Sequence, residues 1–212
     1  MRAVRHGVGG VARPARRAGF TLVEAAVVVA ILGILLAMGM PSMSNWLLAR
    51  RAAAAAVFYQ DGMVMARNQA IAHNSASRLV LTENANGQMD WRVDICLPNL
   101  ATPCDDDHGT WSTVDSAVAG FKSVGRSAQA MPGEADMAQS LAPSGATDVY
   151  FTPLGWVDQR VAPRLASIVI APAARRQGAF RRQAVVLTLG GIAAVCDPDA
   201  ADHTARKCPP AA

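Results

Sequence analysis

The sequence predicts an α+β fold in which one long N-terminal helix packs on a largely antiparallel β-sheet. An apolar run at 20–40 continues into an alanine-rich stretch with few helix breakers, and short apolar segments separated by turn residues follow it. With 212 residues the chain can form one modest domain with appendages. The expected parts are a basic leader at 1–19, a transmembrane anchor at 20–40, the outer half of the helix at 41–74 and a β-rich globular part at 75–212.

The leader holds the excess positive charge. Five arginines and no acidic residue precede Gly19, whereas the formal net charge of the whole chain is +4. Without those five, the chain holds 15 basic and 16 acidic residues. The basic character therefore belongs to the leader and does not indicate that the folded part binds nucleic acid.

The apolar run at 20–40 predicts a membrane anchor. Its only charged residue is Glu24. A helix of this length spans roughly 32 Å, enough for the hydrocarbon core of a bilayer and too long for a cleaved secretory signal. The arginines before it place the N-terminus in the cytoplasm, because positive charge stays on that side. The chain after Pro41 is then expected in the periplasm.

The segment Gly19-Phe20-Thr21-Leu22-Val23-Glu24 resembles the type IV prepilin processing motif, a basic leader ending in glycine followed by phenylalanine and, as fifth mature residue, glutamate. The resemblance implies that prepilin peptidase cleaves between Gly19 and Phe20 and that the new amine on Phe20 is methylated. It also implies that Glu24 pairs with the amine of a neighbouring subunit, which offsets the desolvation of both charges. Pilins of this class often carry a helix-kinking proline where Pro41 stands. The alternative is an ordinary signal anchor that tolerates one glutamate and ends at Pro41.

The stretch from Ser42 to about His73 predicts an amphipathic helix that packs on a sheet. Asp61 lies opposite the apolar face, which Gln60 and Arg67 interrupt. Trp46 suits a membrane interface, and ordinary exposure on the helix surface explains it equally well. The apolar face comprises Ala56, Tyr59, Met63, Val64, Ala66, Ala70 and Ile71.

Alternating and apolar runs after His73 predict the strands of the sheet. Turns are expected at 84–87, at 153–155 and at Gly190-Gly191, and low-signal connections at 97–110 and 132–145. The predicted strands are 78–82, 89–96, 148–152, 165–171, 183–189 and 192–196.

The four cysteines predict two disulfides. Cys96, Cys104, Cys196 and Cys208 do not have the spacing of a zinc site, and a periplasmic location would favour oxidation. Four cysteines allow three pairings. We favour the sequential pairing, because it closes two short loops.

Within the pilin class, the chain resembles the GspH/FimT family. The residues that support this are the strand starting at Arg78, Trp91 in the next strand, and Val149-Tyr150-Phe151-Thr152-Pro153-Leu154-Gly155. The resemblance implies a minor subunit that primes or caps a type II secretion pseudopilus or a type IV pilus. Its expected partners are other subunits, the inner membrane and secreted cargo. FimT-like members also bind DNA through an arginine-bearing motif after a glycine, and the corresponding stretch 190–194 has no arginine here.

Arg175, Arg176, Arg181 and Arg182 are the candidate residues for the alternative function, a DNA-binding minor pilin for natural transformation. We favour a solvated hairpin tip, because Phe180 is the only aromatic residue among them. Two acidic loops, at 105–108 and 197–203, offer oxygen atoms that could hold calcium, but they lack the spacing of an EF-hand. We favour solvated surface loops, and no metal site is predicted. No catalytic motif emerges and no cofactor is expected, so the predicted function is structural and not enzymatic.

Overall fold

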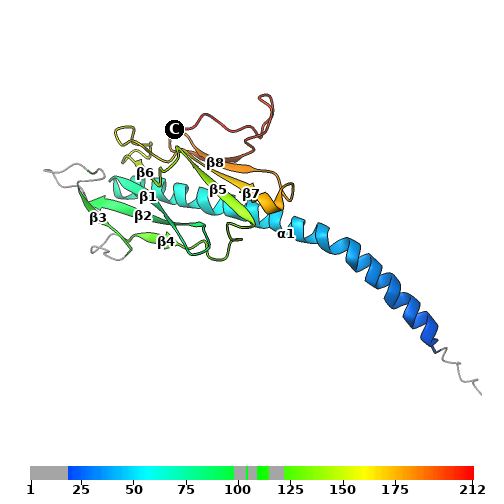
Figure 1. The fold of residues 1–212 in the computed structure, drawn as a ribbon. Coiled ribbons are helices and arrows are strands. Elements are labelled where there is room, and N and C mark those ends of the chain that lie inside the picture. Colours follow the sequence, from blue (N-terminus) through cyan, green and yellow to red (C-terminus); the bar gives the residue numbers. More distant parts are fainter. Residues whose placement is uncertain (1–18, 98–103, 105–108, 115–121) are drawn as a thin grey trace, which may run out of the picture. The chain divides into compact units, whose positions relative to one another are not determined.

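The computed structural model describes residues 19–97, 104, 109–114 and 122–212, without the side chains of 38–42. The chain forms two compact units, Met1–Ser42 and Met43–Ala212. Helix α1, Leu22–His73, contributes to both units (Figure 1). The expected α+β class is confirmed.

Helix α1 ends at His73 with a C-terminal cap. Asn74 has a φ of 47°, the left-handed conformation that asparagine tolerates better than most residues. Its amide donates to the Ile71 carbonyl oxygen at 3.2 Å, and the Ser75 amide donates to the Ala70 carbonyl oxygen at 3.1 Å. This pair of bonds is a Schellman motif, which satisfies carbonyls at the helix end and turns the chain toward the first strand.

The first sheet is antiparallel and is built around a hairpin. Its central strands are β1 (Ser77–Glu83) and β2 (Met89–Leu97), joined through the predicted turn in which the Gly87 amide donates to the Asn84 carbonyl oxygen. Strand β6 (Asp148–Phe151) pairs with β1. Two short strands, β3 (Thr110–Ser112) and β4 (Val124–Arg126), pair with different parts of β2.

A second antiparallel sheet corrects the expectation of one sheet. Its strand order is β5–β7–β8–β9. Strand β5 (Met137–Ala142) lies in the stretch that we interpret from sequence as a connection, and it pairs over its whole length with β7 (Ser167–Pro172). Strands β8 (Gln183–Leu187) and β9 (Ala193–Cys196) complete the sheet, and a short 3-10 helix, η1 (Ala174–Arg176), follows β7.

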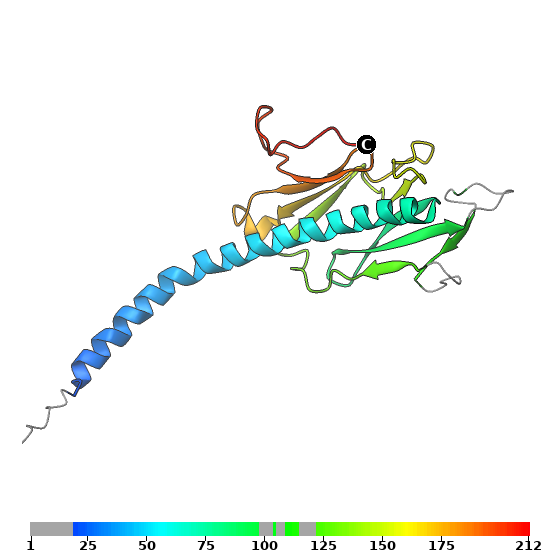
Figure 2. The ribbon, with the colours of Figure 1, turned by 180° about the vertical axis from the view of Figure 1, so that it is seen from behind.

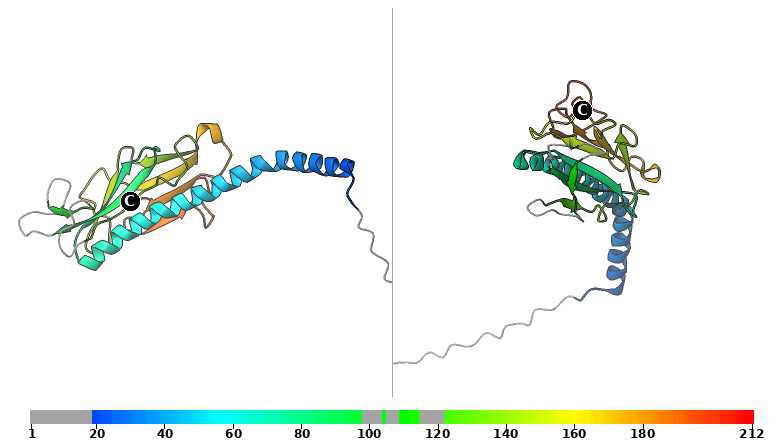
Figure 3. Two further views of the ribbon diagram at one scale, coloured as in Figure 1. Left: turned by 90° about the horizontal axis from the view of Figure 1, so that it is seen from below. Right: turned by 90° about the vertical axis from the view of Figure 1, so that its left-hand side faces the viewer.

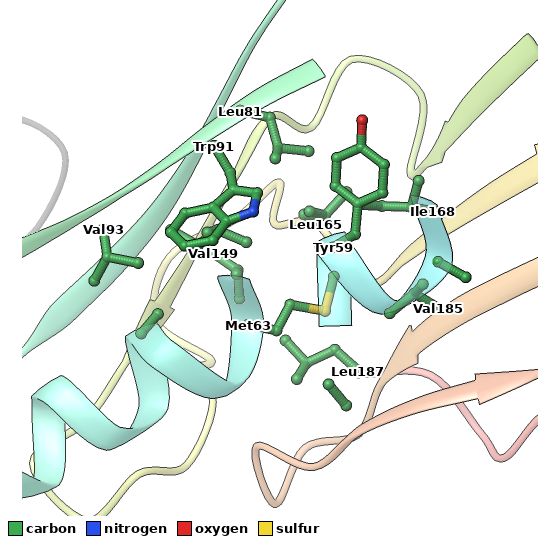
Figure 4. Packing of buried hydrophobic residues seen from close by; sticks show 14 of the residues in the cluster. Tyr59, Met63, Leu81, Trp91, Val93, Val149, Leu165, Ile168, Val185 and Leu187 are labelled. Carbon is green, nitrogen blue, oxygen red and sulfur yellow. The ribbon is translucent and has the colours of Figure 1, made fainter. Parts of the chain in front are cut away.

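The part of α1 that belongs to the second unit, residues 43–73, packs against both sheets. In Figure 2 this part passes in front of them, with the green strands of the first sheet below and the orange strands of the second above. Two further views show the same arrangement (Figure 3). In Figure 4, Met63 lies between Trp91 of the first sheet and Leu187 of the second, and Tyr59 points away from Leu187 beside them. All four side chains are buried in one core cluster.

The buried face of α1 differs in detail from the expected one. Tyr59, Met63 and five alanines of the described part of α1 are buried, but Val64 is 40% and Ile71 46% exposed. The two polar interruptions are partly buried, and they bond to β9 of the second sheet and to the turn that follows β6 of the first sheet. Gln60 Nε2 donates to the Ala193 carbonyl oxygen at 2.9 Å, and Arg67 Nε donates to the Gly155 carbonyl oxygen at 3.1 Å.

A small polar network is buried where the helix meets the two sheets. The Tyr59 hydroxyl donates to the Met89 carbonyl oxygen at 2.8 Å and accepts from Gln139 Nε2 at 2.7 Å. Gln88, on the first sheet side, donates to the Met137 carbonyl oxygen of the second sheet at 2.8 Å. Because its burial is unfavourable to the phenolate, the pKa of Tyr59 is raised to about 12.

Candidate functional site

The predicted processing site lies directly before the start of α1. Gly19, Phe20 and Thr21 are not helical, and the helix begins at Leu22. Thr21 caps the helix: its Oγ1 accepts a hydrogen bond from the Glu24 amide at 3.2 Å, and its carbonyl oxygen accepts one from the Ala25 amide at 3.1 Å. This cap is not among the sequence predictions, although the Thr-x-x-Glu spacing is that of a capping box.

Glu24 lies in the first turn of α1, as expected. The N-terminal end of a helix carries a partial positive charge, so a carboxylate is favourable there. The structure therefore gives Glu24 a local reason to stand at this position, in addition to any partner in an assembly.

The residues on both sides of the predicted cleavage bond are exposed. Phe20 is 83% exposed, and a side chain added at Gly19 would meet no described atom within 4 Å. Large apolar side chains on all sides of the following helix are also exposed: Leu22, Val23, Val27, Val28, Val29, Ile31, Leu32, Ile34, Leu35 and Leu36. An apolar surface of this extent is typical of a segment that another apolar surface covers.

The helix continues through position 41. The backbone of α1 is helical there, so Pro41 does not end the helix, and the predicted kink stays a prediction. In the part of the chain that the structure describes, no helix is both long and apolar enough to cross a membrane.

The structure divides the predicted arginine cluster. Arg175 and Arg176 both pair with Asp136, at 3.1 Å and 2.7 Å, and the hydrogen bond from Arg176 lowers the pKa of this carboxyl group. Arg182 pairs with Asp199 through both oxygens, and this hydrogen bonding lowers the pKa of Asp199 and raises that of Arg182. Within the described residues, only the Arg181 side chain of the four has no ion-pair partner.

The cysteines form the pairing favoured from sequence. Cys96 is bonded to Cys104, with Cα atoms 6.1 Å apart, and Cys196 to Cys208, with Cα atoms 4.9 Å apart. The second disulfide closes the loop that follows β9.

The two acidic loops give no metal site in the described residues. The first, 105–108, lies outside them. In the second, Asp199 binds Arg182 and Asp202 binds Lys207. Over the ranges that the structure describes, no three histidine, cysteine or acidic side chains gather in a group that could hold a metal ion.

Two turns singled out by the sequence lie against each other. The turn at Pro153–Gly155 and the turn at Gly190-Gly191 are joined by a bond from the Val157 amide to the Leu189 carbonyl oxygen, 3.0 Å long. Both Gly155 and Gly191 have positive φ, 77° and 75°. A Cβ at Gly191 would lie 2.0 Å from the Gly155 carbonyl oxygen, so no other residue fits without movement.

One buried charge has no counterpart in the sequence analysis. Asp94 is fully buried on β2 and pairs with Arg78 at 3.0 Å and Arg92 at 3.4 Å. The Arg78 guanidinium also lies 4.4 Å from the centre of the Trp111 ring. The position of Asp94 between these two arginines fits a structural ion pair that joins β1 to β2.

Comparison with known proteins supports the N-terminal motif. A family model described as the prokaryotic N-terminal methylation motif matches residues 14–40, about an eighth of the chain. No curated protein and no solved structure was found to match the chain. The matched motif implies processing by prepilin peptidase and assembly with other pilins, and it is typical of structural proteins. The segment around Gly19, Phe20 and Glu24 is therefore a methylation motif of the type IV pilin-like kind.

Proposed function

We propose that this chain is a minor pilin or pseudopilin of the GspH/FimT type, cleaved between Gly19 and Phe20 and methylated at Phe20. Residues 20–40 anchor it in the inner membrane, and the globular unit lies in the periplasm. The observation that carries the proposal is the capped helix start next to the exposed bond at Gly19, followed by a helix whose apolar side chains are uncovered on all sides.

Processing is tested by the mass of the protein extracted from membranes. We expect the mature chain to begin at Phe20 and to carry one added methyl group. Gly19→Val should leave the leader attached, because the peptidase would meet a branched side chain at the bond. Gly33→Val is the matched control, since it makes the same change in the exposed helix away from that bond. A leader that persists in the unaltered protein contradicts the proposal.

Assembly is proposed to bury the apolar helices side by side, with Glu24 accepting the charged amine of a neighbour's Phe20. An unpaired carboxylate in an apolar environment is costly, so this pairing sets the register of the subunits. Glu24→Ala should preserve cleavage and reduce the amount of subunit in sheared fibres. Asp61→Ala removes an exposed carboxylate elsewhere on α1 and is the control. Normal incorporation of the Glu24 variant would show that another contact sets the register.

The machine that the subunit serves is tested in a deletion strain. Exoproteins that accumulate in its periplasm would assign the subunit to a type II secretion pseudopilus, with secreted proteins as cargo. Unchanged secretion with altered piliation would assign it to a type IV pilus.

DNA binding through the arginine cluster is the weaker candidate. Arg175, Arg176 and Arg182 each have a carboxylate partner, so their charges are partly neutralised before any phosphate approaches. Reversing the four charges should therefore leave DNA retention by the pilus unchanged. A large, salt-dependent loss of retention would favour the DNA-uptake function instead.

A further inference from the structure

The loop closed by the second disulfide forms a pocket with the beginning of β8. Its cavity measures about 320 Å³, which is in the range of small-ligand sites. Two adjacent bonds close the loop beside the pocket: the Cys196–Cys208 disulfide and the bond from the Asp197 amide to the Arg206 carbonyl oxygen at 2.8 Å. The lining of the pocket includes Arg181, Arg182, Val195, Cys196, Ala205 and Arg206, together with the acidic residue Asp197. A neighbouring hollow shares Arg181, Asp197, Ala205 and Arg206 with this pocket.

Arg181 and Arg206 differ from the other cations around them. Within the described residues, neither guanidinium takes part in an ion pair, whereas Arg182 is held by Asp199 and Lys207 by Asp202. Two arginines that come from segments 25 positions apart in the chain therefore meet at one pocket with their donors uncommitted. Guanidinium groups bind planar oxyanions through paired hydrogen bonds, which makes this an anion site.

The surroundings select the kind of anion. Val195, Cys196 and Ala205 give the wall an apolar part. Asp197 also lines the pocket, and Asp199, which pairs with Arg182, lines the neighbouring hollow, so a ligand with many negative charges would be repelled. A single carboxylate on an aliphatic stem satisfies both conditions, because its charge meets the two arginines and its carbons meet the apolar wall.

We propose that this pocket binds the carboxylate of an acidic side chain of a partner protein. One glutamate or aspartate carboxylate is held there by Arg181 and Arg206. Arg182 acts as a positioning residue only, since its guanidinium is held by Asp199.

The experiment uses the full chain in a non-ionic detergent, with ¹⁵N-labelled arginine, and follows the side-chain Nε–Hε signals by NMR. The probe is a blocked tripeptide with a central glutamate, and the matched control peptide has glutamine at the centre. We expect saturable shifts of the Arg181 and Arg206 signals with the glutamate peptide alone. Equal responses to both peptides, or no response to either, would overturn the proposal.

Variants localise the site. Arg181→Gln and Arg206→Gln should each weaken binding of the glutamate peptide about tenfold, the usual effect of losing one charge-assisted hydrogen bond. Arg176→Gln, which removes an arginine already paired with Asp136, should leave binding unchanged. Equal weakening by all three would show a nonspecific charge effect and would contradict the pocket.

Inorganic phosphate and a short single-stranded DNA complete the test. If phosphate and DNA both bind more weakly than the glutamate peptide, the carboxylate assignment is supported. Tighter binding of the DNA that depends on Arg181 and Arg206 would replace it with a nucleic-acid site. The pocket belongs to the globular unit, so its binding is measured without cleavage or fibre assembly, and its failure leaves the proposed function intact.

Discussion

Gly155 and Gly191 hold two turns together that are far apart in the sequence. Both have positive φ, and the space that a Cβ would need is occupied by Ile71 at one turn and by the Gly155 carbonyl oxygen at the other. The Arg67 side chain of α1 bonds to the same carbonyl oxygen at 3.1 Å. The end of the helix, the first sheet and the second sheet therefore meet at two residues without side chains.

Replacing Gly191 by alanine tests this close contact. We expect the free energy of unfolding to fall by about 2–4 kcal/mol, because backbone strain and a clash add. Gly178→Ala is the matched control: its φ is 79° but the space around it is open, so only the strain of about 1 kcal/mol should appear. Thermal unfolding of the full chain in detergent, followed by circular dichroism, measures both. If both substitutions lower the free energy of unfolding equally, the backbone near Gly155 moves aside at little cost and the clash adds nothing.

The buried hydroxyl of Tyr59 predicts a loss of stability at high pH. An ordinary tyrosine has a pKa of 10.0, and that of Tyr59 is raised to about 12. Between these values the unfolded chain releases the proton and the folded chain keeps it, so the stabilising contribution is complete below pH 10 and is lost as the pH rises toward 12. The loss should total about 2–3 kcal/mol.

Tyr59→Phe gives the comparison for this pH dependence. It should lower stability at neutral pH by about 1–3 kcal/mol, since the Met89 carbonyl and Gln139 lose their partner. Its stability should then decline less between pH 10 and 12 than that of the unaltered chain. Parallel declines of the two proteins would assign the alkaline sensitivity to other groups.

At the scale of the element, α1 depends on its first residues for a defined start. Thr21 Oγ1 accepts the Glu24 amide, one of the donors that no preceding turn can satisfy. Thr21→Ala should weaken the first turn by about 1 kcal/mol, whereas Thr21→Ser keeps the hydroxyl and should behave as the original. Hydrogen exchange of a peptide covering the first turn, measured by mass spectrometry in detergent, should be faster only in the alanine variant. Similar exchange in both would indicate that the cap contributes little.

The elements were predicted from sequence to the extent that their own residues specify them. The long helix and the β1–β2 hairpin follow from alanine content, alternation and the turn at Gly87, which are local signals. Strand β5 was missed because its sequence, Met137–Ala142, is mixed in polarity, and it becomes a strand through pairing with β7. The division into two sheets has the same origin, since it depends on which strands pair.

Prediction of the candidate sites has the same limit: contiguous motifs are recognised from sequence, and contacts between distant segments are not. The motif at Gly19, Phe20 and Glu24 is contiguous and was found directly. Arg206 was not nominated, because its place beside Arg181 results from the folding of the disulfide loop onto β8. The ion pairs of Arg175 and Arg176 with Asp136 likewise join residues about 40 positions apart.

At the scale of the whole molecule, the two disulfides make the location of the globular unit measurable. All four cysteines lie in the described part of the chain and are paired. A periplasmic unit should keep both disulfides, because that compartment is oxidising. Protein denatured from intact cells should therefore react with a thiol reagent only after reduction, gaining four adducts by mass. Adducts formed without reduction would place the unit in a reducing compartment.

The buried position of Trp91 against α1 makes its fluorescence a probe of the contact between the helix and the sheets. Its indole nitrogen donates to the Phe58 carbonyl oxygen at 3.0 Å and its ring is 2% exposed, whereas Trp46 and Trp156 are 57% and 60% exposed. Emission from a dry indole lies at shorter wavelength and resists an aqueous quencher such as iodide. Trp111 is half-buried, so the unquenched part of the fluorescence should come from Trp91 and, to a smaller extent, from Trp111. A red shift of this part would signal that the helix has left the sheets.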